Sequence, residues 1–406
     1  MKLWRSYPRN LKVLMIAMLI NSTGMAFLWP LHTIYITQGM NRSLTDAGFV
    51  LMVHSAAEIV GSFLGGYLYD RLRGKITLLY GGIASTLMLL VISVGLSWPA
   101  YIFAMILLGV GIGTIFPAIY ALAGSVWVEG GRRSYNLIYL ILNIGVAIGT
   151  ALGGIVAQFS FRYVFWANAS SYVIFLLVVW FLLQEPKQQV QQSEKPSRTL
   201  NRSVRFSKSP GFVSFLVLCL GFMFCWITYI QWQTTISSVM LQFGYSLSSY
   251  SLLWTVNGLL IILLQPIIQW FMQRRNIGWG WQLEAGVVLY MITFLLLSQS
   301  QQYSAFLIGM MIMTIGEILI FPLVPAIADH LAPNGRKGIY QGIVNGAANV
   351  GRTIGPLFGG LLIDFFLPKV FLYSCVGVCG CALICFISYQ RLQYTKSNME
   401  LVKVSK

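Results

Sequence analysis

Long apolar runs, separated by short polar stretches, repeat along the whole chain. A helix that crosses a bilayer needs about 20 mostly apolar residues, and twelve such runs can be drawn. The twelve predicted spans are residues 12–37, 45–69, 76–96, 100–126, 136–158, 163–184, 212–238, 249–272, 279–299, 303–328, 339–363 and 369–390. Spans 5 and 11 are the least hydrophobic. The pattern predicts an all-α polytopic membrane protein with 12 transmembrane helices.

The composition agrees with a chain that lies in a lipid bilayer. Apolar residues make up 57% of the 406 residues and charged residues only 9%, against about 25% charged residues in soluble domains. So few charges cannot cover a water-exposed surface. The N-terminal apolar run continues past the length of a signal peptide and lacks a small-residue cleavage site, so we interpret it as the first span.

The basic residues define an orientation. The net charge is +16, and 23 of the 27 Lys and Arg residues fall on the side of the two termini. Only Arg42, Arg162 and Lys369 fall on the other side, and Arg352 lies within a span. The positive-inside rule therefore predicts cytoplasmic termini in a cell (plasma or inner) membrane, and the charge requires no nucleic acid as a partner.

A polar segment divides the chain into two similar parts. Residues 185–211 are rich in Gln, Ser, Lys and Arg, which is typical of a linker on the cytoplasmic side. We therefore expect an N-terminal six-helix bundle at 1–184, a C-terminal six-helix bundle at 212–390 and a cytoplasmic tail at 391–406.

The two halves repeat each other in sequence. GIGTIFPAIYALAG at 111–124 aligns with GEILIFPLVPAIAD at 316–329, and NIGVAIGTALGG at 143–154 aligns with NVGRTIGPLFGG at 349–360. Both pairs are offset by about 205 residues. The members of each pair cross the membrane in the same direction, so the repeat is parallel, about an axis along the membrane normal.

The loop after the second span, GGYLYDRLRGKI at 65–76, is close to the G-x-x-x-D-R-x-G-R-K signature of the major facilitator superfamily. The matching residues are Gly66, Asp70, Arg71 and Lys75. Arg73 and Gly74 stand in reversed order. With the six-plus-six layout and the basic linker, the chain resembles this family over essentially its whole length. The resemblance implies that spans 1, 4, 7 and 10 line a cavity and that this loop latches the halves together; the alternative is a loop kept basic for topology alone.

A second family pattern, G-x-x-x-G-P-x-x-G-G, is associated with antiporters and occurs in span 11, with a near match in span 5. The residues of this helix-packing motif are Gly145, Gly149, Gly153, Gly351, Gly355, Pro356 and Gly359. Thr150 stands where the pattern has its proline in span 5. Glycines four residues apart form a groove in which another helix packs closely and can rock, although tight packing alone also accounts for them.

Four ionisable residues lie within predicted spans, where charges are expensive and mark functional candidates. These proton-coupling candidates are Glu317, Glu58, Arg352 and His54. Our hypothesis is that Glu317 is the site of protonation and of cation recognition. The alternative is a permanent ion pair that fixes helix packing, in which Arg352 pairs with Glu58 or with Glu317.

Aromatic and amide side chains in the spans are candidates for lining a substrate cavity. They are Asn21, Trp29, His32, Trp226, Tyr229, Gln231, Trp232 and Asn257. Such side chains suit large lipophilic ligands, which are often cationic, but Trp and Tyr also gather at lipid interfaces. The six cysteines lie in apolar runs without His or carboxylate at ligand spacing, so we expect neither a metal site nor a disulfide.

The sequence thus favours a secondary active transporter that works by alternating access. It contains no Walker A motif and no catalytic constellation, so we expect no enzyme and no cofactor, with the proton gradient as the energy source. The closest resemblance, to twelve-span drug–proton antiporters, implies efflux of lipophilic small molecules by a monomer. A dedicated carrier of one solute class (sugar, peptide, amino acid or lipid) and a non-transporting sensor are the alternatives.

Overall fold

The computed structural model describes residues 7–28, 32, 35–42, 44–157, 161–184, 210–333 and 335–404, and every regular element among them is helical. The long helices of the first half are α2 (Arg9–Leu28), α4 (Leu44–Leu72), α5 (Gly74–Ser93), α6 (Trp98–Val126), α7 (Arg132–Ala157) and α8 (Phe161–Leu182). Those of the second half are α9 (Pro210–Tyr229), α11 (Leu247–Arg274), α12 (Trp279–Gln299), α13 (Tyr303–Ile320), α14 (Leu323–Leu331), α15 (Lys337–Phe365) and α16 (Pro368–Val404). The short elements are η1 (Tyr35–Gly39), η2 (Val128–Gly130), η3 (Ile230–Trp232) and α10 (Thr235–Gln242).

Within the described residues, nine helical segments are long and apolar enough to cross a membrane. The other three long helices are α2, α7 and α15, of which α7 and α15 correspond to the two spans of lowest predicted hydrophobicity. They pack between neighbouring helices: α2 lies against α7 and α8, and α15 against α4 and α9. Because other helices enclose them, they can carry polar residues and glycines at membrane depth. The twelve-helix all-α fold expected from the sequence is confirmed.

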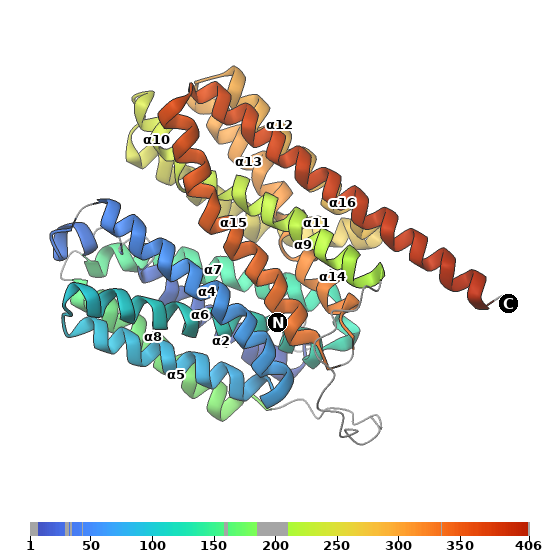
Figure 1. Ribbon diagram of the computed structural model, residues 1–406, viewed down its shortest axis with the longest axis horizontal. Coiled ribbons are helices and arrows are strands. Elements are labelled where there is room, and N and C mark those ends of the chain that lie inside the picture. The colour runs from blue at the N-terminus through green and yellow to red at the C-terminus, as the bar shows by residue number, and fades with distance from the viewer. Residues whose placement is uncertain are drawn as a thin grey trace.

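The helices form two bundles, each with its own hydrophobic core (Figure 1). Tyr172 and Phe175 are fully buried in the first bundle, and Trp232 and Phe294 in the second. The bundles meet where α4 packs on α15 and where α7 packs on α11. In the repeat, α4 corresponds to α11 and α7 corresponds to α15. The two contacts are therefore equivalent, as a parallel duplication requires. Tyr139 of α7 is an exception, because its side chain belongs to the core of the second bundle.

Span 10 differs from the prediction, because it is not one continuous helix. It is divided into α13 and α14 at residues 321–322, whereas its counterpart α6 continues through Pro117. Pro322 and Pro325 both lack an N–H, so two backbone hydrogen bonds are lost within one turn of the second half. A single proline in α6 leaves the rest of the helical ladder intact.

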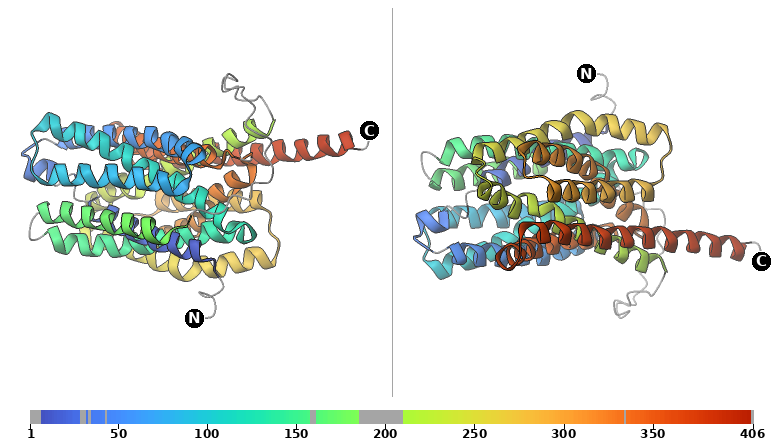
Figure 2. Two further views of the ribbon diagram at one scale, coloured as in Figure 1. Left: turned by 90° about the horizontal axis from the view of Figure 1, so that it is seen from below. Right: turned by 90° about the horizontal axis from the view of Figure 1, so that it is seen from above.

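Two other predicted boundaries also differ. The span predicted at 212–238 ends as α9 at Tyr229 and continues through η3 into the short helix α10. The segment predicted as a tail at 391–406 is not a separate unit in its described part, because α16 continues to Val404 and extends beyond the bundle (Figure 2). The predicted linker lies largely outside the described residues.

The clustered Arg and Lys residues lie at one end of the molecule, which we call the basic end. It consists of the α4–α5, α6–α7, α11–α12 and α14–α15 connections with the first residues of α7 and α15, and its basic residues include 73, 132, 133, 275, 336 and 337. The two bundles lie close together near α14 at this end and diverge toward the end that contains η1 and α10 (Figure 1).

Candidate functional site

Glu317 lies near the end of α13 with only 2% of its surface exposed. Its Oε1 accepts hydrogen bonds from the hydroxyl of Tyr139 at 2.5 Å and from the hydroxyl of Tyr229 at 3.0 Å. Its Oε2 accepts one from Asn257 Nδ2 at 2.9 Å, and the same amide donates to Thr314 Oγ1 at 2.9 Å. We call these five residues the Glu317 cluster.

The Glu317 cluster joins the two bundles. Tyr139 comes from α7 of the first bundle, while the other members come from α9, α11 and α13 of the second. Gly316 allows α13 to pack closely on α12, because a Cβ at that position would lie 2.7 Å from the carbonyl oxygen of Gly286. The carboxyl group is thereby fixed one turn before the break in span 10.

The donors of the Glu317 cluster are neutral groups. The three ion pairs among the described residues involve other carboxylates. An ionised Glu317 can accept from all three donors. A protonated Glu317 needs an acceptor for its O–H, and Asn257 can supply its amide oxygen by turning over. The cluster can therefore accommodate Glu317 in either protonation state.

Aromatic rings continue from the Glu317 cluster toward the interface between the bundles. The ring of Tyr229 lies 5.0 Å from that of Phe321, and Phe321 stacks on Trp226 with centroids 4.6 Å apart. Phe222 contacts Phe321 edge-on at 5.6 Å. Such a group of rings offers a large apolar and polarisable surface.

The other three ionisable candidates form a second group, the Glu58 cluster. His54 Nε2 lies 3.4 Å from Glu58 Oε1, and Arg352 Nη2 lies 4.0 Å from Glu58 Oε2. Of the two pairings expected for Arg352, the structure contains the one with Glu58. Arg352 also donates to Asn349 Oδ1 on its own helix.

The geometry of the Glu58 cluster allows a proton to be held between His54 and Glu58. His54 Nδ1 lies 2.8 Å from the carbonyl oxygen of Met105, and a carbonyl can only accept, so this nitrogen donates. A favourable contact between Nε2 and the carboxyl group then requires a second proton, on either the imidazole or Glu58. The pair can therefore store one exchangeable proton.

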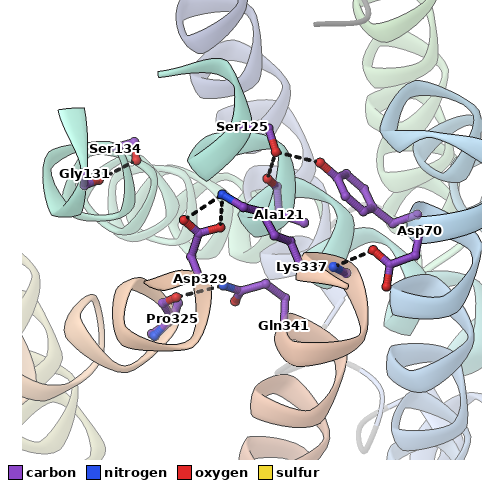
Figure 3. A network of polar contacts seen from close by, with 11 residues as sticks. Asp70, Ala121, Ser125, Gly131, Ser134, Pro325, Asp329, Lys337 and Gln341 are labelled. Carbon is purple, nitrogen blue, oxygen red and sulfur yellow. Dashed lines mark hydrogen bonds and ion pairs between the residues drawn. The ribbon is translucent and has the colours of Figure 1, made fainter. Parts of the chain in front are cut away.

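At the basic end, Asp70 links the two bundles. Its Oδ1 and Oδ2 accept hydrogen bonds from the backbone N–H groups of Gly338 at 2.9 Å and Ile339 at 3.0 Å, the first of which is drawn in Figure 3. These groups belong to the first turn of α15, where a carboxylate is favoured by the helix dipole. Gly66 and Gly338 permit the close approach, since a Cβ on Gly66 would lie 2.4 Å from the carbonyl oxygen of Gly338.

The rest of the loop signature does not bridge the bundles in the same way. The exposed Arg71 lies over the ring of Tyr67 on its own helix at 5.5 Å. Lys75 donates to the carbonyl oxygen of Trp180 at 2.7 Å, within the first bundle. Arg73 has φ +78° and ψ 157°, a conformation that glycine adopts readily and other residues do not. The family signature has its glycine at this position.

Several further polar contacts surround this latch. Lys337 pairs with Asp329 at 2.9 Å, and Tyr69 shares a hydrogen bond with Ser125 (Figure 3). The side-chain contacts that cross between the bundles nearby are Arg132 with Gln282, Arg133 with Gln273, and Gln265 with the carbonyl oxygen of Asn136. A cleft of about 610 Å³ opens among the residues of the α6–α7 and α11–α12 connections and does not include the Glu317 cluster.

The remaining predicted cavity residues are placed differently from one another. Gln231 donates to the carbonyl oxygens of Ile227 and Gly355, so it joins α9 to α15 inside the second bundle. Trp232 is fully buried in the core of that bundle. Asn21 is buried in the first bundle.

His32 is also buried, and its ring lies 6.2 Å from that of His54, close to the hydroxyl of Tyr101. Trp29 lies outside the described residues.

The glycines of the helix-packing motif mediate contacts inside each bundle. Gly145 and Gly149 place α7 against α2, since Cβ atoms there would lie 2.8 Å from the oxygen of Leu19 and 2.2 Å from that of Thr23. In the second bundle, the equivalent contact is between α15 and α9 at Gly351 and Gly355, while Gly359 packs on η3 and the start of α10. Pro356 lies inside α15 and Gly153 inside α7.

The sequence analysis missed Tyr139, which is the only member of the Glu317 cluster from the first bundle. A single tyrosine in an apolar span belongs to no motif and carries no charge that would mark it as a functional residue. A signal was available in the repeat, because Tyr139 lies one turn before Asn143, the position that aligns with Asn349.

The sequence model of the Major Facilitator Superfamily matches residues 14–345 and 234–400. The uncharacterized MFS-type transporter YttB of Bacillus subtilis strain 168 is 42% identical over 400 residues, which cover 98% of this chain and 100% of YttB. The quinolone resistance protein NorA of Staphylococcus aureus strain MSSA476 is 21% identical over 387 residues, covering 93% and 96% of the two chains.

Solved structures share the fold. The human organic anion transporter MFSD10 (TETRAN) has a TM-score of 0.74 at 14% identity, over 94% of this chain and 99% of that chain. A POT family transporter in complex with 5-aminolevulinic acid has a TM-score of 0.73 at 15% identity, over 95% and 97%. At such identities the likeness concerns the fold alone.

Proposed function

The chain belongs to the major facilitator superfamily and is a secondary transporter, and on this basis we propose that it exports lipophilic small molecules in exchange for protons. The observation that carries the proposal is the Glu317 cluster, a buried carboxyl group held by neutral donors from both bundles. The adjacent rings of Tyr229, Phe321 and Trp226 suit lipophilic substrates. The similarity to NorA, a quinolone resistance protein, supports the same substrate class.

Proton binding at Glu317 would change the contact between the bundles. An ionised carboxylate accepts a charge-assisted hydrogen bond from Tyr139, and such bonds are roughly twice as strong as neutral ones. Protonation therefore weakens a direct link between α7 and α13 and favours the movement of one bundle relative to the other. A proton shared by His54 and Glu58 would form a second, auxiliary site at the α4–α15 contact, and the 3.4 Å distance between His54 Nε2 and Glu58 Oε1 supports this role.

We propose that the basic end faces the cytoplasm of a monomer in the plasma membrane. The hydrogen bonds of Asp70 to α15 then close the cytoplasmic side, which favours the outward-facing state of the cycle. In the proposed cycle, Glu317 takes up a proton from the outside after substrate release, and this uptake prepares the return to the inward-open state.

Everted membrane vesicles with a preformed pH gradient test this function. A panel of lipophilic cations and neutral drugs is added to vesicles that contain the wild-type protein, Glu317→Gln or Glu284→Gln. Glu284 is a matched control, because it accepts a hydrogen bond from Gln390 inside the second bundle. We expect several unrelated compounds to dissipate the gradient with wild type and Glu284→Gln, but not with Glu317→Gln.

Two outcomes would contradict the proposal. A response to one chemical class only would identify a dedicated solute carrier in place of a drug exporter. A full response in Glu317→Gln would show that the coupling proton binds elsewhere.

A further inference from the structure

Arg352 occupies a position that resembles that of a bound organic cation. Its Cζ lies 5.0 Å from the centroid of the Trp226 ring, and its Nη2 lies 4.0 Å from Glu58 Oε2. An aromatic face on one side and a carboxylate on the other are the two groups with which proteins bind ammonium and guanidinium ligands.

The geometry of the rings defines the face that Arg352 covers. Phe321 stacks on Trp226 at 4.6 Å with an interplanar angle of 26°, so one face of the indole is occupied. Arg352 also covers a face of this indole, with its Cζ 5.0 Å from the ring centroid. A ligand that replaced the guanidinium would rest on this face, and it would be one ring away from Tyr229 and the Glu317 cluster.

The position lies between the bundles and is partly exposed. Glu58 belongs to α4 of the first bundle, while Trp226 and Arg352 belong to α9 and α15 of the second. Tyr120 of α6 is also close enough to interact electrostatically with Arg352. The side chains of Arg352 and Glu58 are 26% and 18% exposed, whereas Glu317 is only 2% exposed.

The internal repeat argues against a role of Arg352 in the fold alone. The equivalent residue of the first half is Val146, in a helix that packs on α2 as α15 packs on α9. The same helix contact therefore forms without a cation. The side chain of Arg352 also has an alternative acceptor on its own helix, Asn349 Oδ1, which can hold it when it leaves the ring.

We infer that Trp226 and Glu58 form a binding subsite for lipophilic organic cations, and that Arg352 is its resident occupant, which a cationic substrate displaces. This inference rests on the proposed export function and specifies its substrate class. Arg352 then sets the substrate specificity, because it competes with cations for the Trp226–Glu58 subsite and does not compete with neutral molecules. A weakly bound cation cannot displace it, whereas a large aromatic cation gains more contact with the rings than the guanidinium does.

The test measures binding to the purified full-length protein in nanodiscs, with tetraphenylphosphonium as the cation and triphenylphosphine oxide as the neutral analogue. We expect Arg352→Gln to bind tetraphenylphosphonium about tenfold more tightly, within the range of a cation–π contact, with unchanged affinity for the oxide. Adding Trp226→Leu or Glu58→Gln to this variant should remove the gain. Arg352→Lys, which holds the ring less well, should show a smaller gain and serves if Arg352→Gln does not fold.

Arg274→Gln is the matched control, because Arg274 Cζ lies 5.1 Å from the Trp270 ring at the exposed basic end, and it should leave both affinities unchanged. Unchanged or weaker cation binding in both Arg352 variants, or an equal change for both ligands, would overturn the inference. Its failure is distinct from that of the proposed function. A binding gain that persists without drug-driven proton movement supports the subsite and contradicts proton-coupled export. If neutral drugs alone are exported and the binding gain is absent, proton-coupled export is supported and the cation subsite is refuted.

Discussion

Replacing Tyr139 with Phe removes one hydroxyl group and tests whether its bond to Glu317 holds the two bundles together. The ring stays in the core of the second bundle, so packing is largely conserved. The hydroxyl donates to Glu317 Oε1 at 2.5 Å in a fully buried setting. A hydrogen bond to a charged group contributes about 1.5–3 kcal/mol, which corresponds to roughly a 10- to 150-fold change in an equilibrium.

The expected consequence is a shift away from the state that is closed at the basic end. Gln282 reports on this state, because it is 2% exposed and contacts Arg132 of the other bundle. We expect a cysteine at position 282 to react with a water-soluble maleimide at least about tenfold faster when Tyr139→Phe is present. Mass spectrometry of the labelled peptide separates this site from the native cysteines.

Tyr229→Phe is the matched control for this measurement. It removes a hydroxyl from the same carboxyl oxygen, but Tyr229 and Glu317 belong to the same bundle. We expect this variant to leave the labelling of residue 282 near the wild-type rate. Equal labelling in Tyr139→Phe and wild type, or equal acceleration in both tyrosine variants, would refute the idea that the Tyr139 bond joins the bundles.

Three other predictions concern the basic end. Asp70→Ala removes the acceptor of two backbone N–H groups of α15. We therefore expect faster labelling of a cysteine at position 282 and slower transport. Labelling at the wild-type rate would contradict a latching role of Asp70. A Cβ added at Gly338 would lie 2.3 Å from the carbonyl oxygen of Gly66, so the larger side chain of Gly338→Val cannot fit between α4 and α15. We expect normal membrane insertion, shown by cell fractionation, with loss of transport in vesicles; full transport would contradict close packing. Arg73→Gly relieves a backbone conformation that costs about 1–3 kcal/mol in other residues, so a higher midpoint of denaturation in detergent is expected, and an unchanged midpoint would contradict the strain.

Most of the fold could be predicted from the sequence, because a bilayer permits few alternatives. Backbone polar groups must be satisfied within each span, so a run of about 20 apolar residues predicts a helix. Glu317 could also be found, since an acid in an apolar span is costly and its counterpart in the repeat is Ile112.

Contacts between distant helices could not be predicted from local patterns. The choice of Arg352 between Glu58 and Glu317 depends on how α15 is rotated against α4, which no single span encodes. Tyr139 reaches Glu317 only because α7 packs on the second bundle. The interruption of span 10 had a visible cause in Pro322 and Pro325, but whether two prolines bend or break a helix depends on its neighbours.

The central claim is that Glu317 exchanges its proton when a substrate binds. Purified protein in a lightly buffered solution is mixed with a transported lipophilic compound, and the released protons are counted with a pH indicator. We predict that the wild-type protein releases protons on binding and that Glu284→Gln does so equally, whereas Glu317→Gln binds the compound without release. Proton release of wild-type size from Glu317→Gln would contradict the account.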